Sequence, residues 1–228
     1  MARTEQIERA GASGETSRFV VRPMTPADIP QVMDIERESF PTMWPQTAYA
    51  RELKNRLARY FVLCEEGKQG AAFEERSRVS PWRRAMGRFL RKEQEPEPTP
   101  ELIIGVIGLW MMVDELHIVT IAVRQAFRRQ GAGEALLITA IDFALANKMD
   151  AVTLEYRRSN EPARALYDKY GFLNVGVRTR YYSDNNEDAI VMTTPPLLSR
   201  AQHRLFLRLK EEHRRRWGGR YLLPDSLS

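Results

Sequence analysis

A strand-like run, a glycine turn and a long apolar run follow one another near the middle of this 228-residue chain. Residues 117–123 (HIVTIAV) are rich in β-branched side chains, which favour a strand. Residues 128–133 (RRQGAG) are too small and too charged to build a core, whereas residues 133–147 are apolar nearly all round a helical projection. A strand that passes through a tight turn into a covered helix is a unit of α/β folds, so this segment constrains the architecture most.

The turn also has the chemistry of an anion site. The first N–H groups of a helix have no partner within the helix, and the helix dipole favours negative charge there. Gly131 and Gly133 let the backbone approach a ligand without a Cβ in the way, and Arg128 and Arg129 add positive charge. These features predict a cradle for a pyrophosphate, with a plain strand–helix turn as the alternative. The turn lacks the lysine of a P-loop and the third glycine of a dinucleotide-binding motif.

The remaining patterns predict one α/β domain over residues 18–196, with a mixed sheet flanked by helices and a flexible tail at 1–17. Asn160 is expected to cap a helix that ends at Gly171. Strands are predicted at 17–24, 60–66, 102–113, 117–123, 151–156, 172–177 and 188–194, and helices at 25–40, 47–58, 133–147, 162–170 and 199–217.

Two basic segments depart from this pattern. Residues 68–92 and 200–220 each carry eight Lys or Arg against two Asp or Glu, although the net charge of the whole chain is only +5. The first lies in a segment, 67–100, that ends in a proline-rich run and is predicted to be an insertion between two strands of the sheet. For this insertion a mobile surface loop is the alternative to a binding role. The second belongs to a basic C-terminal tail, 197–228, predicted to be helical. Both suit weak contact with a ribosome or another anionic surface. The aromatic residues interleaved with these charges are Trp82, Phe89, Phe206 and Trp217.

Composition narrows the classes of function. No apolar run reaches the roughly 18 residues of a membrane-spanning helix, and the polar N-terminal residues carry no export signal. Cys64 is the only cysteine, so no internal disulfide can form, which suits a reducing cytoplasm. Three histidines and one cysteine without ligand spacing predict no metal site. We therefore expect a cytoplasmic protein in which Cys64 is a small buried side chain.

Several segments taken together resemble one known family. The turn at 128–133 and the strand before it resemble the acetyl-coenzyme A motif of the GNAT superfamily of N-acetyltransferases. Residues 154–172 (LEYRRSNEPARALYDKYGF) and 178–192 are similar to the RimI family, the ribosomal-protein-alanine N-acetyltransferases. The opening at 21–36 and the loop at 40–45 also fit, so the likeness spans the predicted domain apart from the insertion.

The resemblance implies a mixed sheet that splays open in its middle, where acetyl-CoA enters as cosubstrate. It also implies acetyl transfer to the N-terminal α-amine of a protein, a ribosomal protein among the candidates. By resemblance, Ile121, Ala122 and Val123 offer backbone groups to the pantetheine arm, and Asn160 hydrogen-bonds the cofactor. The expected pyrophosphate turn consists of Arg128, Arg129, Gln130, Gly131, Ala132, Gly133 and Glu134.

Two residues fall on the family's catalytic positions. Transfer to an amine requires the amine to lose a proton and the departing thiolate to gain one. By resemblance, Glu155 is the general base, acting through a bridging water, and Tyr167 is the general acid in a direct attack. A protein N-terminal amine has a pKa near ~8, against ~10.4 for lysine, so modest help suffices. A surface carboxylate and a core-edge tyrosine are the plain alternatives.

Other functions fit some of these residues. A small-molecule amine acetyltransferase is one, and a ribosome- or nucleic-acid-binding protein on a GNAT scaffold is another. Because a scaffold has no use for Glu155, Asn160 and Tyr167 together, this set favours an enzyme. His117 is a candidate lining residue of the substrate groove, and the pair at 181–182 is a candidate cover for the peptide; a purely structural role is the alternative for each.

Overall fold

The structure is a computed structural model that describes residues 18–40, 47–69 and 101–223. The predicted N-terminal tail, most of the predicted insertion, and Trp82 and Phe89 lie outside these ranges. The elements are β1 (Phe19–Pro23), η1 (Pro26–Asp28), α1 (Ile29–Ser39), α2 (Tyr49–Glu52), β2 (Ala58–Gln69), β3 (Glu101–Met111), β4 (Glu115–Val123), η4 (Gln125–Phe127), α4 (Ala132–Ala146), β5 (Ala151–Arg157), α5 (Glu161–Lys169), β6 (Leu173–Tyr182), β7 (Glu187–Thr193), α6 (Arg200–Arg216) and β8 (Tyr221–Leu222).

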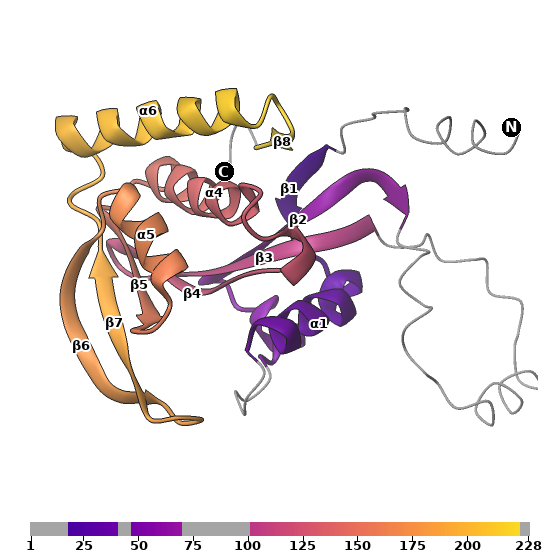
Figure 1. The fold of residues 1–228 in the computed structure, drawn as a ribbon, viewed down its shortest axis with the longest axis horizontal. Coiled ribbons are helices and arrows are strands. Elements are labelled where there is room, and N and C mark those ends of the chain that lie inside the picture. The colour runs from indigo at the N-terminus through magenta and orange to yellow at the C-terminus, as the bar shows by residue number, and fades with distance from the viewer. Residues whose placement is uncertain (1–17, 41–46, 70–100, 224–228) are drawn as a thin grey trace, which may run out of the picture.

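The described strands form one mixed sheet in the order β6-β7-β5-β4-β3-β2-β1-β8, which confirms the predicted α/β class. Figure 1 shows α4 and α6 on one side of this sheet and α1 on the other. Successive residues of a strand point to opposite faces. In β2, accordingly, Phe61 and Leu63 belong to the core under α4, whereas Val62 and Cys64 belong to the core under α1. No helix among the described residues is long and apolar enough to cross a membrane.

The sheet opens between β4 and β5. These two parallel strands are paired from Glu115↔Ala151 to Ile118↔Leu154, and the pairing stops there. Beyond that point β4 continues to pair with β3 as far as Val123, while β5 pairs with β7 from Thr153 onward. The two strands therefore diverge at Glu155, which matches the splay that the resemblance implied.

The C-terminal helix predicted at 199–217 is present as α6, and it lies along α4 (Figure 1). Its apolar side chains Phe206 and Leu209 belong to the same core as α4. Lys210 Nζ lies 2.7 Å from a carboxylate oxygen of Asp142 on α4. The short strand β8 then pairs in parallel with β1. The sequence did not predict β8, because two residues carry no periodic signal.

One predicted helix is much shorter than expected. The pattern at 47–58 gives only α2, Tyr49–Glu52, and β2 already begins at Ala58. Asn55 forms a turn there, since its side-chain oxygen accepts from the amide of Leu57 at 3.0 Å and its carbonyl accepts from the amide of Ala58 at 3.1 Å. The leucine spacing misled the prediction because Leu57 is 59% exposed instead of buried.

Candidate functional site

Glu155 is the first residue of β5 beyond the pairing with β4. Its side chain is 8% exposed and both of its oxygens have cationic or proton-donating partners. Oε2 lies 3.0 Å from Nε2 of His117, and Oε1 lies 2.8 Å from a guanidinium nitrogen of Arg178. The hydrogen bond from His117 and the charge of Arg178 hold the pKa of Glu155 below its ordinary value, despite the opposing effect of burial. The group is therefore a carboxylate at neutral pH.

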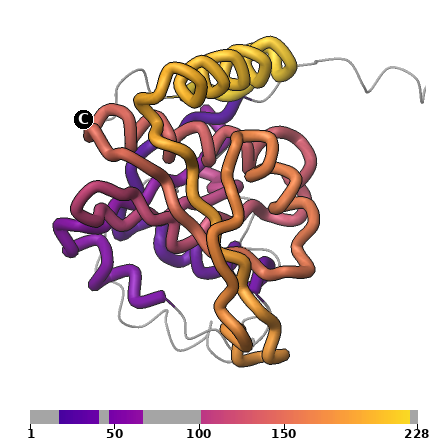
Figure 2. Tube along the Cα trace, turned by 90° about the vertical axis from the view of Figure 1, so that its left-hand side faces the viewer, coloured from indigo at the N-terminus to yellow at the C-terminus, as the bar shows by residue number. Residues whose placement is uncertain are grey.

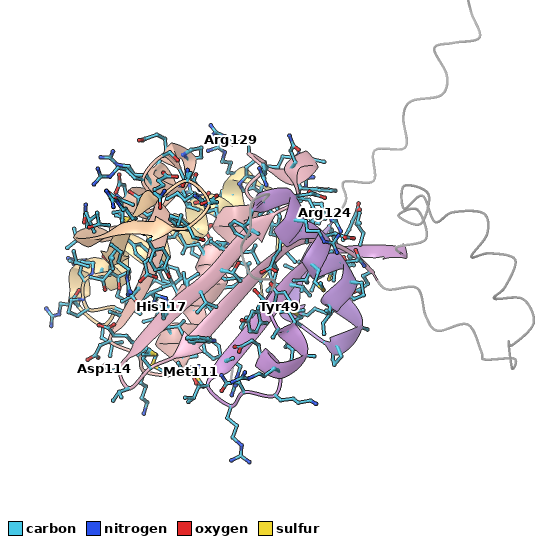
Figure 3. The ribbon with its side chains drawn as sticks, turned by 90° about the horizontal axis from the view of Figure 1, so that it is seen from below. Tyr49, Met111, Asp114, His117, Arg124 and Arg129 are labelled. Atoms are coloured by element: carbon cyan, nitrogen blue, oxygen red, sulfur yellow. The ribbon has the colours of Figure 1, made fainter. Side chains whose placement is uncertain are left out.

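His117 comes next to Glu155 through strand register. It pairs with Thr153, so Glu155 is its diagonal neighbour two residues further on the same face. Nδ1 of His117 lies 2.9 Å from the hydroxyl of Thr153. A carboxylate only accepts, so Nε2 carries the proton toward Glu155. Figure 3 shows His117 between the end of β4 near Asp114 and the end near Arg124. The sequence had only suggested His117 as a lining residue.

Tyr167 lies in the third position from the C-terminal end of α5 and is 3% exposed. Its ring contacts Tyr156 on β5, with centroids 5.7 Å apart, and Phe172 at 5.6 Å. Burial raises its pKa well above the ordinary value, with a smaller effect from Tyr182. The phenol is thus protonated at neutral pH, which is the state that a proton donor needs. Asn160 caps this helix, as predicted, since its side-chain oxygen accepts from the amide of Ala163 at 3.2 Å.

The turn at 128–134 brings the start of α4 to the far end of β4. Gly131 is the N-cap of α4 and has a φ of 85°, in the left-handed region that favours glycine. Arg129 also has a positive φ, 61°, and is exposed; Figure 3 shows it beyond Arg124. The amide of Ala135 donates a hydrogen bond to the carbonyl of Gly131 at 2.9 Å. The amides before Ala135 belong to the first turn of the helix, where backbone N–H groups have no partner within the helix. Ala132 at this end is buried.

The two glycines of the turn have different surroundings. A Cβ on Gly131 would overlap the indole of Trp217, whereas a Cβ on Gly133 would meet only a methyl of Val123 at 3.9 Å. The expectation that both glycines make room for a ligand therefore fits Gly133. At Gly131 the room is taken by the protein's own C-terminal segment.

Glu134 in the first turn of α4 is not an isolated negative charge. Its Oε1 lies 2.5 Å from Nζ of Lys169 and accepts from the hydroxyl of Tyr170 at 2.9 Å. Both partners lie at the end of α5. The pairing offsets an acidic charge that would otherwise oppose an anion at the turn, and it joins α4 to α5.

Arg128 and Gln130 are tied to the protein. Arg128 donates from Nε to the carbonyl of Val123 at 2.9 Å and from a terminal nitrogen to Ser39 at 3.1 Å. Gln130 donates to the carbonyl of Ala126 at 2.9 Å and accepts from Arg220 at 3.2 Å. These contacts fix the shape of the turn.

Ile121, Ala122 and Val123 lie on the part of β4 that has left β5. Their backbones pair with Ile107, Val106 and Gly105 of β3 on one side. On the other side no described strand pairs with them, so this edge is open to a ligand's amide groups. All three thus lie on an unpaired strand edge, and their contact with a pantetheine arm stays a prediction.

The β6–β7 hairpin extends beyond the rest of the molecule in Figure 2 and is held by Arg157. Arg157 lies 2.8 Å from Asp184 and 3.4 Å from Glu187, and it stacks over the ring of Tyr182 at 3.9 Å. Tyr181 is 40% exposed on the same strand. The hairpin therefore places one exposed and one packed tyrosine beside the Glu155 side of the site.

Some alternatives lose support. Cys64 is 1% exposed and burial raises the pKa of its thiol to about 12, so it is unsuited to be a nucleophile. Phe206 is 2% exposed and is therefore unavailable to stack on a nucleic acid base, and the partly buried indole of Trp217 packs on Gly131. Within the described ranges no group of His, Cys, Asp or Glu could hold a metal ion.

The sequence did not indicate a role in the site for several residues. Arg178 gave no signal because one arginine on a polar edge strand is common. The sequence could not predict the contacts of His213, Trp217 and Tyr221 with the turn, because more than 80 residues of chain separate them from it. A hint for Trp217 was an aromatic residue followed by two glycines, a pattern that ends a helix and turns the chain.

Comparison with known proteins finds N-acetyltransferases by family model, by sequence and by structure. The model of the acetyltransferase (GNAT) family matches residues 69–172. The chain is 33% identical over 170 residues to an N-alpha-acetyltransferase of Sulfurisphaera tokodaii, covering 74% of this chain and 87% of that protein. It is 29% identical over 177 residues to a Bacillus subtilis protein provisionally named ribosomal protein bS18-alanine N-acetyltransferase, covering 77% and 95%. The crystal structure of the Escherichia coli ribosomal-protein-S18-alanine N-acetyltransferase superposes with a TM-score of 0.58 at 25% identity, covering 78% and 94%.

Proposed function

The chain belongs to the GNAT family of acetyltransferases and is an acetyl-CoA-dependent N-acetyltransferase, and from this premise we propose that its acceptor is the N-terminal α-amine of a protein. The observation that carries the proposal is the Glu155 carboxylate at the divergence of β4 and β5. The ribosomal-protein acceptors named for two of the relatives make a ribosomal protein the first candidate. A cytoplasmic location stays a prediction.

The residues present fit the cofactor. The free end of α4 offers amides and the positive end of a helix dipole to a pyrophosphate, and Gly133 leaves the approach open. The open edge at 121–123 suits the amides of a pantetheine arm, and Asn160 stands exposed at the start of α5. When bound, acetyl-CoA supplies an activated acetyl thioester. In this proposal Arg129 and the amides of Gln130–Glu134 hold the pyrophosphate, while Arg128 and the Gln130 side chain shape the turn.

Glu155 would hold and deprotonate the acceptor amine. Its lowered pKa makes it a poor direct proton acceptor for an ammonium but keeps its charge at neutral pH. The carboxylate attracts the ammonium, and the neutral fraction of the amine attacks the thioester. Its nitrogen becomes acidic as the new bond to the acyl carbon forms, and the proton then passes through a bridging water to Glu155. About a tenth of an N-terminal amine with a pKa near ~8 is already neutral at pH 7, so a weak base suffices. His117 orients the carboxylate, and the exposed Arg178 gives way to the amine.

Tyr167 would supply the second proton. Its hydroxyl stays protonated because burial raises its pKa, and it lies on the helix that Asn160 caps. With Cys64 buried and protonated, the side-chain set supports direct attack by the amine. An N-terminal amine suits this weak base better than lysine, whose pKa near ~10.4 leaves far less neutral amine.

The test is acetylation of a peptide panel. The full chain is incubated with acetyl-CoA and peptides that start with different residues, each in a free and an Nα-blocked form with an internal lysine. Thiol release and mass spectrometry then locate the acetyl group. We expect modification of the free α-amine only, with a preference for one first residue.

Two controls make the result decisive. Glu155→Gln should abolish most of the transfer, whereas Glu161→Gln, an exposed glutamate of α5, should not. Equal modification of the blocked peptides at lysine, or transfer to a small polyamine but to no peptide, would overturn the proposal.

A further inference from the structure

The C-terminal segment, residues 200–223 (α6 and β8), forms hydrogen bonds with backbone carbonyls of the turn at 128–134, the proposed pyrophosphate site. Nε2 of His213 lies 3.1 Å from the carbonyl oxygen of Gly131. The hydroxyl of Tyr221 donates to the carbonyl of the preceding residue, Gln130. Because a carbonyl only accepts, both side chains act as donors. Two consecutive peptide groups of the turn are therefore held by residues more than 80 positions away.

These bonds fix the direction of amides as well as carbonyls. In a trans peptide the C=O and the following N–H lie in one plane and point in opposite directions. Holding the carbonyl of Gln130 thus orients the N–H of Gly131, and holding the carbonyl of Gly131 orients the N–H of Ala132. Both amides point away from the C-terminal segment, at the free end of α4, where an anion takes its hydrogen bonds.

The contact on Gly131 is close-packed. The indole of Trp217 occupies the space that a side chain at 131 would need, and the rings of Trp217, His213 and Tyr221 contact one another with centroids 5.3–6.4 Å apart. His213 is 2% exposed and Tyr221 8%. The turn itself contains two residues with positive φ. Gly131 adopts this conformation without strain, whereas Arg129 keeps it only where the surroundings hold it.

The segment is anchored independently of the turn. Lys210 pairs with Asp142 of α4 at 2.7 Å, and Gln202 donates to the carbonyl of Tyr170 at 2.9 Å. At the other end the ring of Tyr221 stacks on Phe19 of β1 with centroids 5.5 Å apart, and the amide of Phe19 donates to the carbonyl of Arg220 at 2.7 Å. A support fixed at both ends can hold the turn in one geometry.

We propose that His213, Trp217 and Tyr221 are positioning residues for the acetyl-CoA pyrophosphate, so that docking of the C-terminal segment and cofactor binding strengthen each other. The proposal rests on the assignment of the turn at 128–134 as the pyrophosphate site. A turn that is already ordered does not have to be ordered by the ligand, which raises affinity. By linkage, a ligand that needs this geometry stabilises the docked segment to the same extent.

The test separates the pyrophosphate from the rest of the cofactor. Binding of coenzyme A and of pantetheine, which lacks the pyrophosphate, is measured by calorimetry for the wild type, Tyr221→Phe, His213→Leu and His213→Gln. Loss of one hydrogen-bond donor should weaken the binding of coenzyme A by about tenfold, as expected when part of the population is no longer binding-competent. Pantetheine affinity should change by less than twofold. His213→Gln, which keeps an amide donor at similar reach, should recover most of the loss.

Arg208→Met is the matched control on the same helix. It removes an exposed pair with Glu212 of α6 itself, not with the turn or α4, and should leave coenzyme A affinity within twofold. Steady-state kinetics should repeat the split, with a higher KM for acetyl-CoA and little change in the KM for peptide. Equal losses for pantetheine and coenzyme A, or unchanged coenzyme A affinity in both Tyr221→Phe and His213→Leu, would overturn the proposal. Failure of the wild type to bind coenzyme A would instead overturn the assignment of the turn.

Discussion

The Glu155 side of the candidate site consists of side chains, whereas the turn at 128–134, the proposed pyrophosphate site, consists of backbone groups. His117 and Thr153 are paired across β4 and β5, Glu155 follows two residues after Thr153, and sheet register alone brings the three side chains together. The turn offers backbone amides, and its geometry depends on a helix start and on contacts from α6 and β8. A side-chain site loses chemistry when its residues change but keeps its fold. A backbone site has little chemistry to lose and is damaged through its supports.

The largest expected effect is on the side-chain half. Glu155→Gln keeps the size of the side chain and removes the negative charge that we propose to hold the amine. We expect kcat/KM for peptide to fall by about 10³-fold, within the usual range for a lost general base. Coenzyme A affinity, measured by calorimetry, should change by less than twofold. A comparable loss of coenzyme A binding would show that the two halves are not separable.

Tyr167→Phe should have the next largest effect. The ring keeps its contacts with Tyr156 and Phe172, while the proton is lost. Turnover should fall by about 10²-fold, and raising the pH should not restore it, because neutral amine is not what the variant lacks. In Glu155→Gln, by contrast, activity should recover in part above the amine pKa near ~8. Two pH–rate profiles of the same shape would contradict separate roles for the two residues.

The two glycines of the turn test the backbone half. Gly131→Ala forces a side chain into a φ of 85° and against Trp217, so we expect a loss of about 1–2 kcal/mol in the free energy of unfolding, together with weaker coenzyme A binding. Gly133→Ala meets open space in a helical position and should stabilise the fold by up to about 1 kcal/mol. This variant should nevertheless weaken the binding of coenzyme A, because the new methyl group lies where we expect the ligand to approach.

Denaturation curves and calorimetry on the same samples measure both quantities. If both variants lose stability equally, Gly131 has no special role in the docking of the C-terminal segment. If Gly133→Ala binds coenzyme A as the wild type does, the approach is not past Gly133.

The smallest expected effect is a pH dependence that also divides the two halves. Burial lowers the pKa of His213, which faces Glu134, Lys169 and Arg216, below its ordinary value near 6.5. As the pH falls, the unfolded chain therefore binds the proton first, so stability is complete above about pH 6.5 and declines below it. Glu155, with a lowered pKa, contributes stability above its ordinary value near 4.5 and loses it only as the pH falls through the lower folded value.

Melting temperatures between pH 7 and pH 5 test this order. Part of the decline in that range should disappear in His213→Gln and should persist in Glu155→Gln. The reverse assignment of the two effects would be evidence against a neutral, buried His213.

Much of the fold could be predicted because its signals are local. The runs that became β4 and α4 were found to within a residue or two, since β-branched alternation and all-round apolar patterning each have one good structural solution. The shortened helix at α2 was not predicted, because a leucine spacing of four is as compatible with a turn made by Asn55 as with a helix. The assignments of Glu155 and Tyr167 came from resemblance to a family, and their roles stay predictions.

The sequence by itself determined the α/β class, the helix cap at Asn160, the glycine start of α4 and the membership of a family, because each depends on residues close together in the chain. Only the tertiary structure decided that Glu155 is paired with His117 and Arg178, and that His213, Trp217 and Tyr221 contact the turn at 128–134. These contacts join residues some 20 to 90 positions apart. Such contacts leave no periodic trace in the sequence, and they form only when the sheet and α6 have set the distances.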